Sequence, residues 1–361
     1  MKYSDQMAEW LKDLGYDTFY FVGGGNIMHL TESLDRHLNA IPVIHEVAAV
    51  IAAEYHNHLA GSAKALALVT AGPGITNTIT GLAGAYLESR YVLVIGGQVK
   101  TDDLSRGDTR QNGIQEVDGV TICKPLTNYS VRLDKPIAKK EFHKYAVSNK
   151  NIRKAPVFLE IPLDVQAAQY VSNIGDIVQE DEVQAMPVNE KQLAVMLDLL
   201  RSSQRPVFLL GGGVDIESAH CVERYAVENS IPVATTWNGA DLISSDCPVY
   251  IGRPNTWGQR SSNILIQQAD LVICLGTRLG LQQTGFNWQA FVPVGKVICI
   301  ELDSSELTKG HPNIDLPILG DCNAYINRLT EVAVNKGWET WLDFCVQTRA
   351  AIPLVEEDIN E

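Results

Sequence analysis

The sequence predicts an α/β protein made of two doubly wound domains with mainly parallel sheets. The first observation is a series of continuous apolar runs, which are typical of strands that helices cover on both faces; the clearest are residues 65–70, 91–95, 206–210 and 271–275. The second is that these runs alternate with helical segments, as in folds built from strand–helix units. The third is the length of 361 residues, which exceeds one ordinary domain and suits two.

The composition is that of a soluble globular protein, with 45% hydrophobic and 20% charged residues. A net charge of −14 argues against a nucleic-acid partner or an anionic membrane surface. No apolar run approaches the roughly 18 residues that a membrane span needs, and the N-terminus is typical of an amphipathic helix rather than a signal peptide. The seven cysteines are scattered singly, which suits reduced thiols. We therefore predict a cytoplasmic protein.

The first predicted domain covers residues 1–166 and alternates helices with short apolar strands. Its predicted helices are residues 5–14, 27–38, 47–59, one that opens at Thr76-Asn77, and 137–148. Its predicted strands are residues 17–22, a buried strand end at 41–44, 65–70, 91–95 (closed by 96–98), 129–133 and 157–161. Residues 99–118 form a long polar loop, and loops of that length are usually functional or mobile.

Residues 167–190 are polar and acidic without a sustained period, which predicts an interdomain linker. A second α/β domain follows over residues 191–335. It has predicted helices at 191–203 and 218–229 and predicted strands at 206–210, 231–236, 271–275 and 297–301. Residues 336–361 then hold one helix and a polar tail with nothing to pack.

Glu46 is the candidate catalytic residue of the first domain, because it stands at the first turn of a helix that follows an apolar strand. Carboxyl ends of strands in open α/β sheets form the crevice where ligands bind. An acid there can stabilise the helix N-terminus or do acid–base work, and the residue alone leaves both readings open. We interpret the neighbouring His45 as structural. His56 and His58 point to different faces of their helix, and we predict no metal ligands.

Two sets of motifs occur in order along the chain. The first domain carries Phe21–Met28 (FVGGGNIM), His45-Glu46, Val69–Asn77 (VTAGPGITN), Val94–Gln98 (VIGGQ), Ile114–Asp118 (IQEVD) and Ala155–Asp164 (APVFLEIPLD). The second carries Leu210–Val214 (LGGGV), Ile231–Thr236 (IPVATT), Gly276–Arg278 (GTR) and Ile300–Asp303 (IELD). Over residues 1–345 the chain closely resembles the thiamine-diphosphate-dependent enzymes of the acetolactate synthase and pyruvate oxidase group. The resemblance implies a flavodoxin-like pyrimidine-binding domain and a Rossmann-like central domain.

The resemblance also implies roles for residues of the first domain. Glu46 matches the family's catalytic glutamate, whose hydrogen bond to the pyrimidine promotes the tautomer that deprotonates the thiazolium C2. Gln115 approaches the reacting end from the long loop. Residues implied to surround the pyrimidine are Val22, Gly24, Thr70, Pro73 and Asn77. The implied reaction is decarboxylation and carboligation of a 2-keto acid.

Several positions depart from the family pattern. Ile114 stands where acetolactate synthases carry phenylalanine, and Asn128 stands where they carry lysine. The resemblance assigns flavin contacts in the central domain to Arg153, Gly211, Gly212 and Arg278, so FAD is a candidate cofactor. Gln282 and the sequence Trp257-Gly258-Gln259 replace other residues of that pattern. Substrate and flavin binding therefore stay open.

Enzymes of this family have a third domain, which is identified by a Gly-Asp-Gly motif and a later Asn-Asn. Neither motif occurs in this sequence after residue 330. In the family that domain binds the diphosphate through Mg²⁺, whose preferred ligands are oxygens. We therefore expect thiamine diphosphate and Mg²⁺ to bind only in a complete homodimer or homotetramer. The diphosphate domain would come from a truncated segment, which the polar end at 356–361 favours, or from a separate subunit; this chain alone is expected to be inactive.

Two further readings remain open from the sequence. The chain can be a non-catalytic nucleotide-binding or assembly module in which Glu46 is idle. It can also belong to a related enzyme that acts on a sugar-derived or cyclic diketone substrate, as Ile114 and Asn128 suggest.

Overall fold

A computed structural model describes residues 1–105, 107, 109–147, 153–171, 186–334 and 337–354. The chain forms two compact units, residues 1–183 and 184–361. Each unit contains one six-stranded sheet in which every strand pair is parallel. The predicted α/β class with two parallel sheets is therefore confirmed.

The sheet of unit 1 has the strand order β2-β1-β3-β4-β6-β5. Its strands are β1 (Thr18–Phe21), β2 (Asn39–Pro42), β3 (Ala65–Val69), β4 (Leu93–Gln98), β5 (Tyr129–Arg132) and β6 (Val157–Pro162). Its helices are α1 (Tyr3–Asp13), η1 (Gly25–Ile27), α2 (Met28–Asp35), α3 (Glu46–Ala60), α4 (Pro73–Thr76), α5 (Ile79–Leu87), η2 (Thr101–Asp103), α6 (Gly119–Cys123), η3 (Lys124–Leu126), α7 (Lys139–Ala146) and α8 (Leu163–Ala167).

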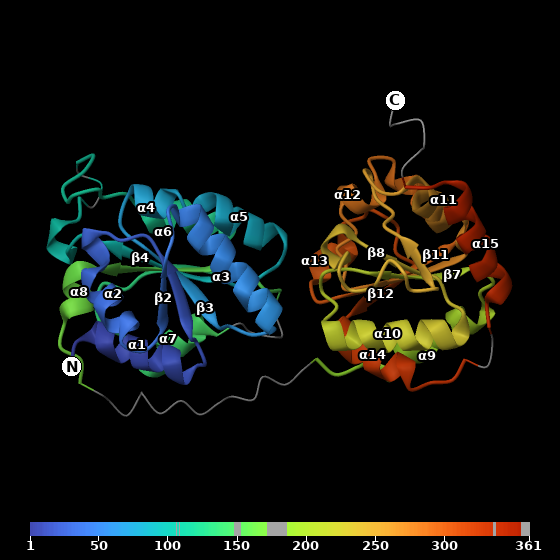
Figure 1. The fold of residues 1–361 in the computed structure, drawn as a ribbon, viewed down its shortest axis with the longest axis horizontal. Helices are drawn as coiled ribbons and strands as arrows, with labels where there is room; N and C mark the ends of the chain where they lie inside the picture. Colours follow the sequence, from blue (N-terminus) through green and yellow to red (C-terminus); the bar gives the residue numbers. More distant parts are fainter. Residues whose placement is uncertain (106, 108, 148–152, 172–185, 335–336, 355–361) are drawn as a thin grey trace. The chain divides into compact units, whose positions relative to one another are not determined.

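Helices cover both faces of this sheet, with α1, α2 and α7 on one side and α3 and α5 on the other (Figure 1). Strand β3 shows how one apolar run serves both cores, because successive side chains point to opposite faces. Leu66 and Leu68 pack with the large side chains of α1, α2 and α7. Ala65, Ala67 and Val69 face α3 and α5, where small residues allow the helices to lie close to the sheet.

Two predictions for unit 1 are wrong in detail. The strand end at 41–44 is not buried: β2 is the edge strand of the sheet, and Ile44 beyond it is 100% exposed. Residues 96–98 do not close the preceding strand but belong to β4, where Gly97 pairs with Ile161 and Gln98 with Pro162. Glycine is depleted in strands, so the sequence favoured a turn that the long neighbour β6 overrides.

The sheet of unit 2 has the strand order β12-β11-β10-β7-β8-β9. Its strands are β7 (Pro206–Leu210), β8 (Val233–Thr235), β9 (Tyr250–Gly252), β10 (Leu271–Leu275), β11 (Lys296–Glu301) and β12 (Leu316–Leu319). Its helices are α9 (Glu190–Ser202), α10 (Ile216–Asn229), η5 (Trp237–Gly239), α11 (Arg260–Gln268), α12 (Leu281–Thr284), η6 (Trp288–Ala290), α13 (Ser304–Thr308), α14 (Cys322–Thr330) and α15 (Glu339–Ala351).

Helices α9, α10 and α14 lie together on one side of the second sheet (Figure 1). The four strands predicted for this unit are confirmed as β7, β8, β10 and β11, whereas β9 and β12 were missed. The two missed strands are short and lie at opposite ends of the sheet. The order of strands reverses between β7 and β10, which is the place where doubly wound sheets usually bind ligands.

The segments that border the second unit are described only in part. Residues 172–185 of the predicted linker and residues 355–361 of the predicted tail lie outside the described residues. We keep the domain limits 1–166 and 191–335 as a proposal. All seven cysteines are free thiols. Among the described helices, none combines the length and the apolar character that a membrane crossing requires.

Candidate functional site

The candidate site lies at the carboxyl ends of β1 and β3 in unit 1. The two strands are parallel neighbours, with Phe21 opposite Leu68, so the turns that follow them meet at the same edge of the sheet. A Cβ atom at Gly24 would lie 2.3 Å from the Cβ atom of Thr70, a distance that real side chains do not reach. Glycine at position 24 is therefore what allows the two turns to touch.

Glu46 opens helix α3 and turns its side chain toward these turns. The preceding His45 is the N-cap, and its Nδ1 accepts a hydrogen bond from the backbone N–H of Val47 at 3.2 Å. Glu46 is only 8% exposed, and its Oε2 accepts a hydrogen bond from Nδ2 of Asn77 at 2.9 Å. No hydrogen bond from the described residues reaches Oε1, which lies 3.6 Å from where a Cβ atom of Gly74 would stand. One carboxylate oxygen is therefore fixed, and the other is available.

Thr70 supplies a second polar atom at this edge. Its Oγ1 is buried and has no hydrogen-bond partner among the described residues. A buried hydroxyl without a partner costs free energy, so such a group in a folded protein usually bonds to a ligand or an ordered water. A Cβ atom at Gly74 would stand 2.9 Å from Cγ2 of Thr70. Glycine here therefore allows the methyl group of Thr70 to pack against the turn, beside the free oxygen of Glu46.

The turn after β3 leads into the four-residue helix α4, with exposed Pro73 at its first position and Asn77 at its C-cap. Gly72 adopts the left-handed region at φ 66°. The sequence placed the helix start at Thr76-Asn77, whereas the first helical residue is Pro73. Proline suits that position because its missing N–H would have no helical partner.

Gln115 comes to this turn from the long loop. A Cβ atom at Gly72 would lie 2.3 Å from the carbonyl oxygen of Gln115, so backbone meets backbone at this point. Gln115 itself has φ 59°, a left-handed conformation that L residues rarely adopt. Nδ2 of Asn26 donates to the carbonyl oxygen of Ile114 at 3.5 Å, which links the first glycine turn to the same segment. The structure thus brings Gln115 beside the Gly72 turn.

Below this segment lies a polar network that the sequence reasoning missed. Gln98 donates through Nε2 to the carbonyl oxygen of Val117 at 2.9 Å and to Oε1 of Glu160 at 3.1 Å. Nε of Arg132 also donates to Glu160, whose side chain is fully buried. Burial raises the pKa of Glu160, although Arg132 and Gln98 act in the opposite direction. The signal was present in the sequence: a single acid interrupts the apolar run 157–161.

Arg153 and Asn128 lie together in unit 1. Nε of Arg153 donates to Oγ of Ser89 at 2.8 Å, and Nδ2 of Asn128 donates to the carbonyl oxygen of Arg153 at 3.3 Å. The assignment of Arg153 to the central domain was therefore wrong, because this residue belongs to unit 1.

The second glycine turn follows β7, at the strand-order reversal of unit 2. Two of its backbone N–H groups donate hydrogen bonds within the chain. The N–H of Gly211 donates to the carbonyl oxygen of Leu275 at 2.9 Å, and that of Gly213 donates to the carbonyl oxygen of Gly276 at 3.0 Å. A Cβ atom at Gly211 would stand 2.4 Å from the carbonyl oxygen of Gly276, so the two turns fill the space between them. The exposed Gly212 lies beside Asn238.

Helix α10 begins directly after this glycine turn and carries acids at its N-terminus. Asp215 is the N-cap and accepts from the backbone N–H of Ser218 at 2.7 Å, and Glu217 stands in the first turn. The backbone N–H of Asp215 is held by Oδ1 of Asn323 at 2.9 Å. This helix N-terminus is therefore capped by the carboxylate of Asp215, with a second acid in its first turn.

Arg278 and Gln259 lie on loops after β10 and β9. Arg278 is exposed, and its carbonyl oxygen accepts from Nζ of Lys309. Oε1 of Gln259 accepts from the backbone N–H of Arg253 at 3.2 Å and from Oγ of Ser262 at 3.1 Å, which gives Gln259 a structural role. The backbone N–H of Thr256 donates to the carbonyl oxygen of Gln282 at 2.9 Å. The segment 257–259 and Gln282, which both differ from the family pattern, are therefore neighbours.

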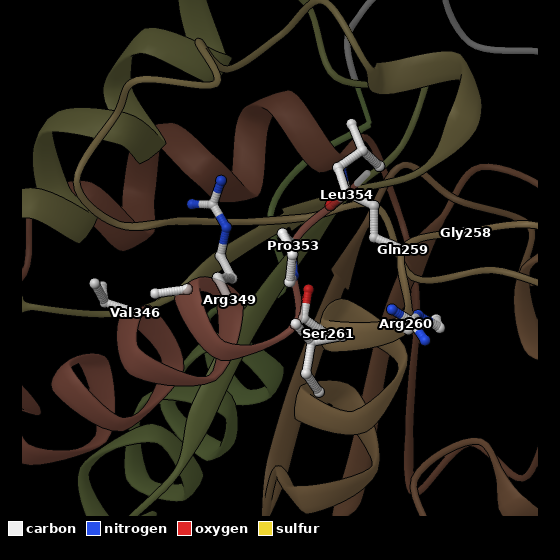
Figure 2. A pocket seen from close by; sticks show the side chains of 10 residues that line it. Gly258, Gln259, Arg260, Ser261, Val346, Arg349, Pro353 and Leu354 are labelled. Atoms are coloured by element: carbon white, nitrogen blue, oxygen red, sulfur yellow. The ribbon is translucent and has the colours of Figure 1, made fainter. Parts of the chain in front are cut away.

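Figure 2 shows a hollow of about 380 Å³ between the start of α11 and the end of α15. Arg349 borders it, donates to the carbonyl oxygen of Tyr250 and lies 5.7 Å from the centre of the Tyr250 ring. Pro353 and Leu354 line the same hollow, so this part of the predicted tail does lie against the protein. Among the described residues, no group of three or more His, Cys, Asp or Glu side chains could hold a metal ion.

Comparison with known proteins decides the family. The model of the "Thiamine pyrophosphate enzyme, N-terminal TPP binding domain" matches residues 1–122, and that of the "Thiamine pyrophosphate enzyme, central domain" matches residues 193–329. The chain belongs to the thiamine pyrophosphate enzymes. The first match contains Glu46, Thr70, Asn77 and Gln115, so the site described above lies within a domain named for cofactor binding.

Curated relatives of these thiamine pyrophosphate enzyme domains carry acetolactate synthase names. A probable acetolactate synthase large subunit of Methanocaldococcus jannaschii is 29% identical over 99% of this chain and 61% of its own length. The acetolactate synthase large subunit of Lactococcus lactis is 29% identical over 99% of this chain and 62% of its own. The isozyme 2 large subunit of Escherichia coli is 29% identical over 95% and 61%. The chain thus spans about three fifths of the length of these relatives.

Proposed function

We propose that unit 1 binds the aminopyrimidine ring of thiamine diphosphate and that Glu46 activates the cofactor in an acetolactate-synthase-like enzyme. The observation that carries the proposal is that only one oxygen of the buried Glu46 carboxylate is bonded. Asn77 donates to Oε2, and Oε1 accepts no hydrogen bond from the described residues. A buried acid with one free oxygen beside a glycine turn suits a hydrogen bond to a ring nitrogen. The relatives named acetolactate synthase support 2-keto acids as the substrate class.

The residues around Glu46 fit a flat, polar ring. Gly24 and Gly74 pack directly against the side chain of Thr70. The buried Oγ1 of Thr70 lacks a partner in the described part of the chain and suits an amino or ring nitrogen. Pro73 and Val22 offer apolar contact at the ends of β3 and β1. When bound, the cofactor supplies an electron sink for decarboxylation. The protein's part is to hold the proton at Oε1 of Glu46 and to keep that oxygen aimed at the ring through Asn77.

Gln115 is proposed to contact the substrate beside the Gly72 turn. Gln115 is exposed, and its backbone packs against Gly72. Its side chain therefore starts next to the turn that follows β3, where the cofactor is proposed to bind. Ile114, 78% exposed, stands beside it and is proposed to influence which substrates enter. Turnover with pyruvate and with larger keto acids or cyclic diketones would separate the substrate classes.

The glycine turn of unit 2 does not fit the diphosphate of FAD. A diphosphate needs free backbone N–H groups in such a turn and at the helix N-terminus that follows it. Here the N–H groups of Gly211, Gly213 and Asp215 in the turn donate within the chain. At the start of α10 the N–H of Ser218 donates to the Asp215 carboxylate. The carboxylates of Asp215 and Glu217 would repel the anion. We therefore propose that Gly211 and Gly212 shape a scaffold turn. Titration of the chain with FAD should leave flavin fluorescence unchanged; quenching that Gly212→Val abolishes would contradict this.

Assembly completes the proposed enzyme. The diphosphate and Mg²⁺ need oxygen ligands that a further domain, in cis or on a separate subunit, would supply. The active form is proposed to be a homodimer or homotetramer in the cytoplasm, with no nucleic-acid or membrane partner.

The test is the exchange of the thiazolium C2 proton with deuterium in the complete assembly, followed by NMR. Glu46→Gln is expected to slow exchange by about 10²- to 10⁴-fold, because an amide has no acidic proton that it can transfer to the ring. The matched control is Glu54→Gln on the same helix, where the acid pairs with Arg90 at 2.9 Å and exchange should not change. Unchanged exchange in Glu46→Gln would leave a non-catalytic module as the better reading.

A further inference from the structure

Glu116 is a carboxylate that the proposed chemistry does not use, and both of its oxygens are occupied. Oε1 accepts from the backbone N–H of Ser105 at 2.7 Å. Oε2 accepts from the backbone N–H groups of Asn112 at 2.9 Å and Gly113 at 3.1 Å. Burial opposes the charge, but these donors outweigh it and hold the pKa of Glu116 below its ordinary value. The side chain is thus an ionised acceptor that ties Ser105 to residues 112 and 113.

The turn next to Glu116 needs such support. Gln115 has φ 59°, and a side chain in the left-handed region costs about 1–2 kcal/mol relative to the right-handed one. Its carbonyl oxygen also rests against Gly72, where no Cβ atom could be placed. The far end of the turn is fixed by Gln98, which donates to the carbonyl oxygen of Val117 at 2.9 Å. Glu116 fixes the near end through Gly113.

We propose that Glu116 is a positioning residue, whose three backbone hydrogen bonds hold Gln115 in its left-handed conformation against Gly72. Because both oxygens already accept hydrogen bonds, Glu116 is not an acid–base group. Charge-assisted bonds of this kind are roughly twice as strong as neutral ones, which suits a carboxylate over an amide. The conformational part of this inference stands on the contacts alone; its consequence for turnover rests on the proposed function.

Hydrogen–deuterium exchange on the full chain, read by mass spectrometry, tests the conformational part. In Glu116→Gln the amide group carries one acceptor instead of two, so amides of residues 104–118 should exchange at least about tenfold faster. Strands β1 and β3 should keep their protection. The matched control is Asp102→Asn, an exposed acid of the same loop, which should change nothing. Glu116→Asp, which keeps the charge, should restore part of the protection.

Two results would overturn the proposal. The first is unchanged exchange over residues 104–118 in Glu116→Gln. The second is an equal rise throughout unit 1, which would make Glu116 a general stabilising residue.

In the complete assembly, Glu116→Gln should lower kcat at least about tenfold with little change in KM for the cofactor, while C2 proton exchange stays normal. An unchanged kcat would contradict the claim that Glu116 affects turnover by positioning Gln115. Failure of Glu46→Gln to slow C2 exchange would instead refute the proposed function and leave the local exchange result standing.

Discussion

Nδ2 of Asn77 donates a hydrogen bond to Oε2 of Glu46 at 2.9 Å, across 31 positions of the chain. Glu46 opens α3 and Asn77 caps α4, so the bond joins the helices that follow β2 and β3. It holds a buried carboxylate with one oxygen fixed and one available, which is the geometry on which the proposed cofactor activation depends.

Removing the donor should destabilise the chain. In Asn77→Ala the buried oxygen of Glu46 loses its partner, and the free energy of unfolding is expected to fall by about 1–3 kcal/mol. Urea unfolding followed by circular dichroism measures the change. Thr80→Ala, an exposed neighbour on α5, is the control and should have a small effect. Equal stability of Asn77→Ala and wild type would show that the hydrogen bond contributes nothing in water.

Two glycines of unit 1 should respond to alanine with opposite signs. Gly72 has φ 66°, and its added Cβ atom would lie 2.3 Å from the carbonyl oxygen of Gln115, so Gly72→Ala should lower stability by about 1–3 kcal/mol or more. Gly84 lies within α5 with nothing within 4 Å of its added Cβ atom. Gly84→Ala should raise stability by about 0.5–1 kcal/mol, because glycine weakens a helix. Thermal unfolding measures both variants, and a stabilising Gly72→Ala would contradict the contact.

Breaking the buried pair of Arg132 and Glu160 should cost stability in a pH-dependent way. Burial already raises the pKa of Glu160, and Arg132→Leu removes the opposing charge. An acid with a raised folded pKa binds more protons folded than unfolded, so stability falls as the pH rises above about 4.5. The loss in Arg132→Leu should be small near pH 4 and reach up to about 3–5 kcal/mol near pH 7.

The control for this pair is Arg36→Leu, which removes an exposed partner of Glu32 and should change stability little at either pH. A loss in Arg132→Leu that is the same at both pH values would argue that the arginine acts through packing of its stem.

Asp164 should make the free energy of unfolding depend on pH in the opposite direction to Glu160. Burial opposes its charge, but Thr101 donates through its hydroxyl at 2.6 Å and its backbone N–H at 3.0 Å, and the pKa of Asp164 is lowered. Its stabilisation is present above about pH 4 and is lost as the pH falls through the folded pKa. Asp164→Asn should therefore be less stable than wild type near pH 6, with the difference shrinking below pH 4 or so. Asp35→Asn, at an exposed helix end, should show no such convergence.

The apolar strands were predictable because a run buried on both faces is visible without knowing its neighbours. Strands β3, β6, β7 and β10 coincide closely with their predicted ranges. The exposed β2 and the missed β9 and β12 could not be judged alone, since their place at or near sheet edges depends on which strands pair. Gly97 in β4 shows the same effect, because pairing with Ile161 overrides its local preference for a turn.

The sequence by itself determined the fold class and the family resemblance, and through that resemblance it predicted that Glu46, Thr70, Asn77 and Gln115 belong to one site. Those inferences rest on residue type and order along the chain, which folding does not change. Only the tertiary structure decided which atoms meet: Asn77 on one oxygen of Glu46, Gln115 on Gly72, and three backbone N–H groups on Glu116. It also decided that the amide oxygen of Asn323 accepts from the backbone N–H of Asp215 after the second glycine turn, because hydrogen-bond partners far apart in sequence are chosen by packing.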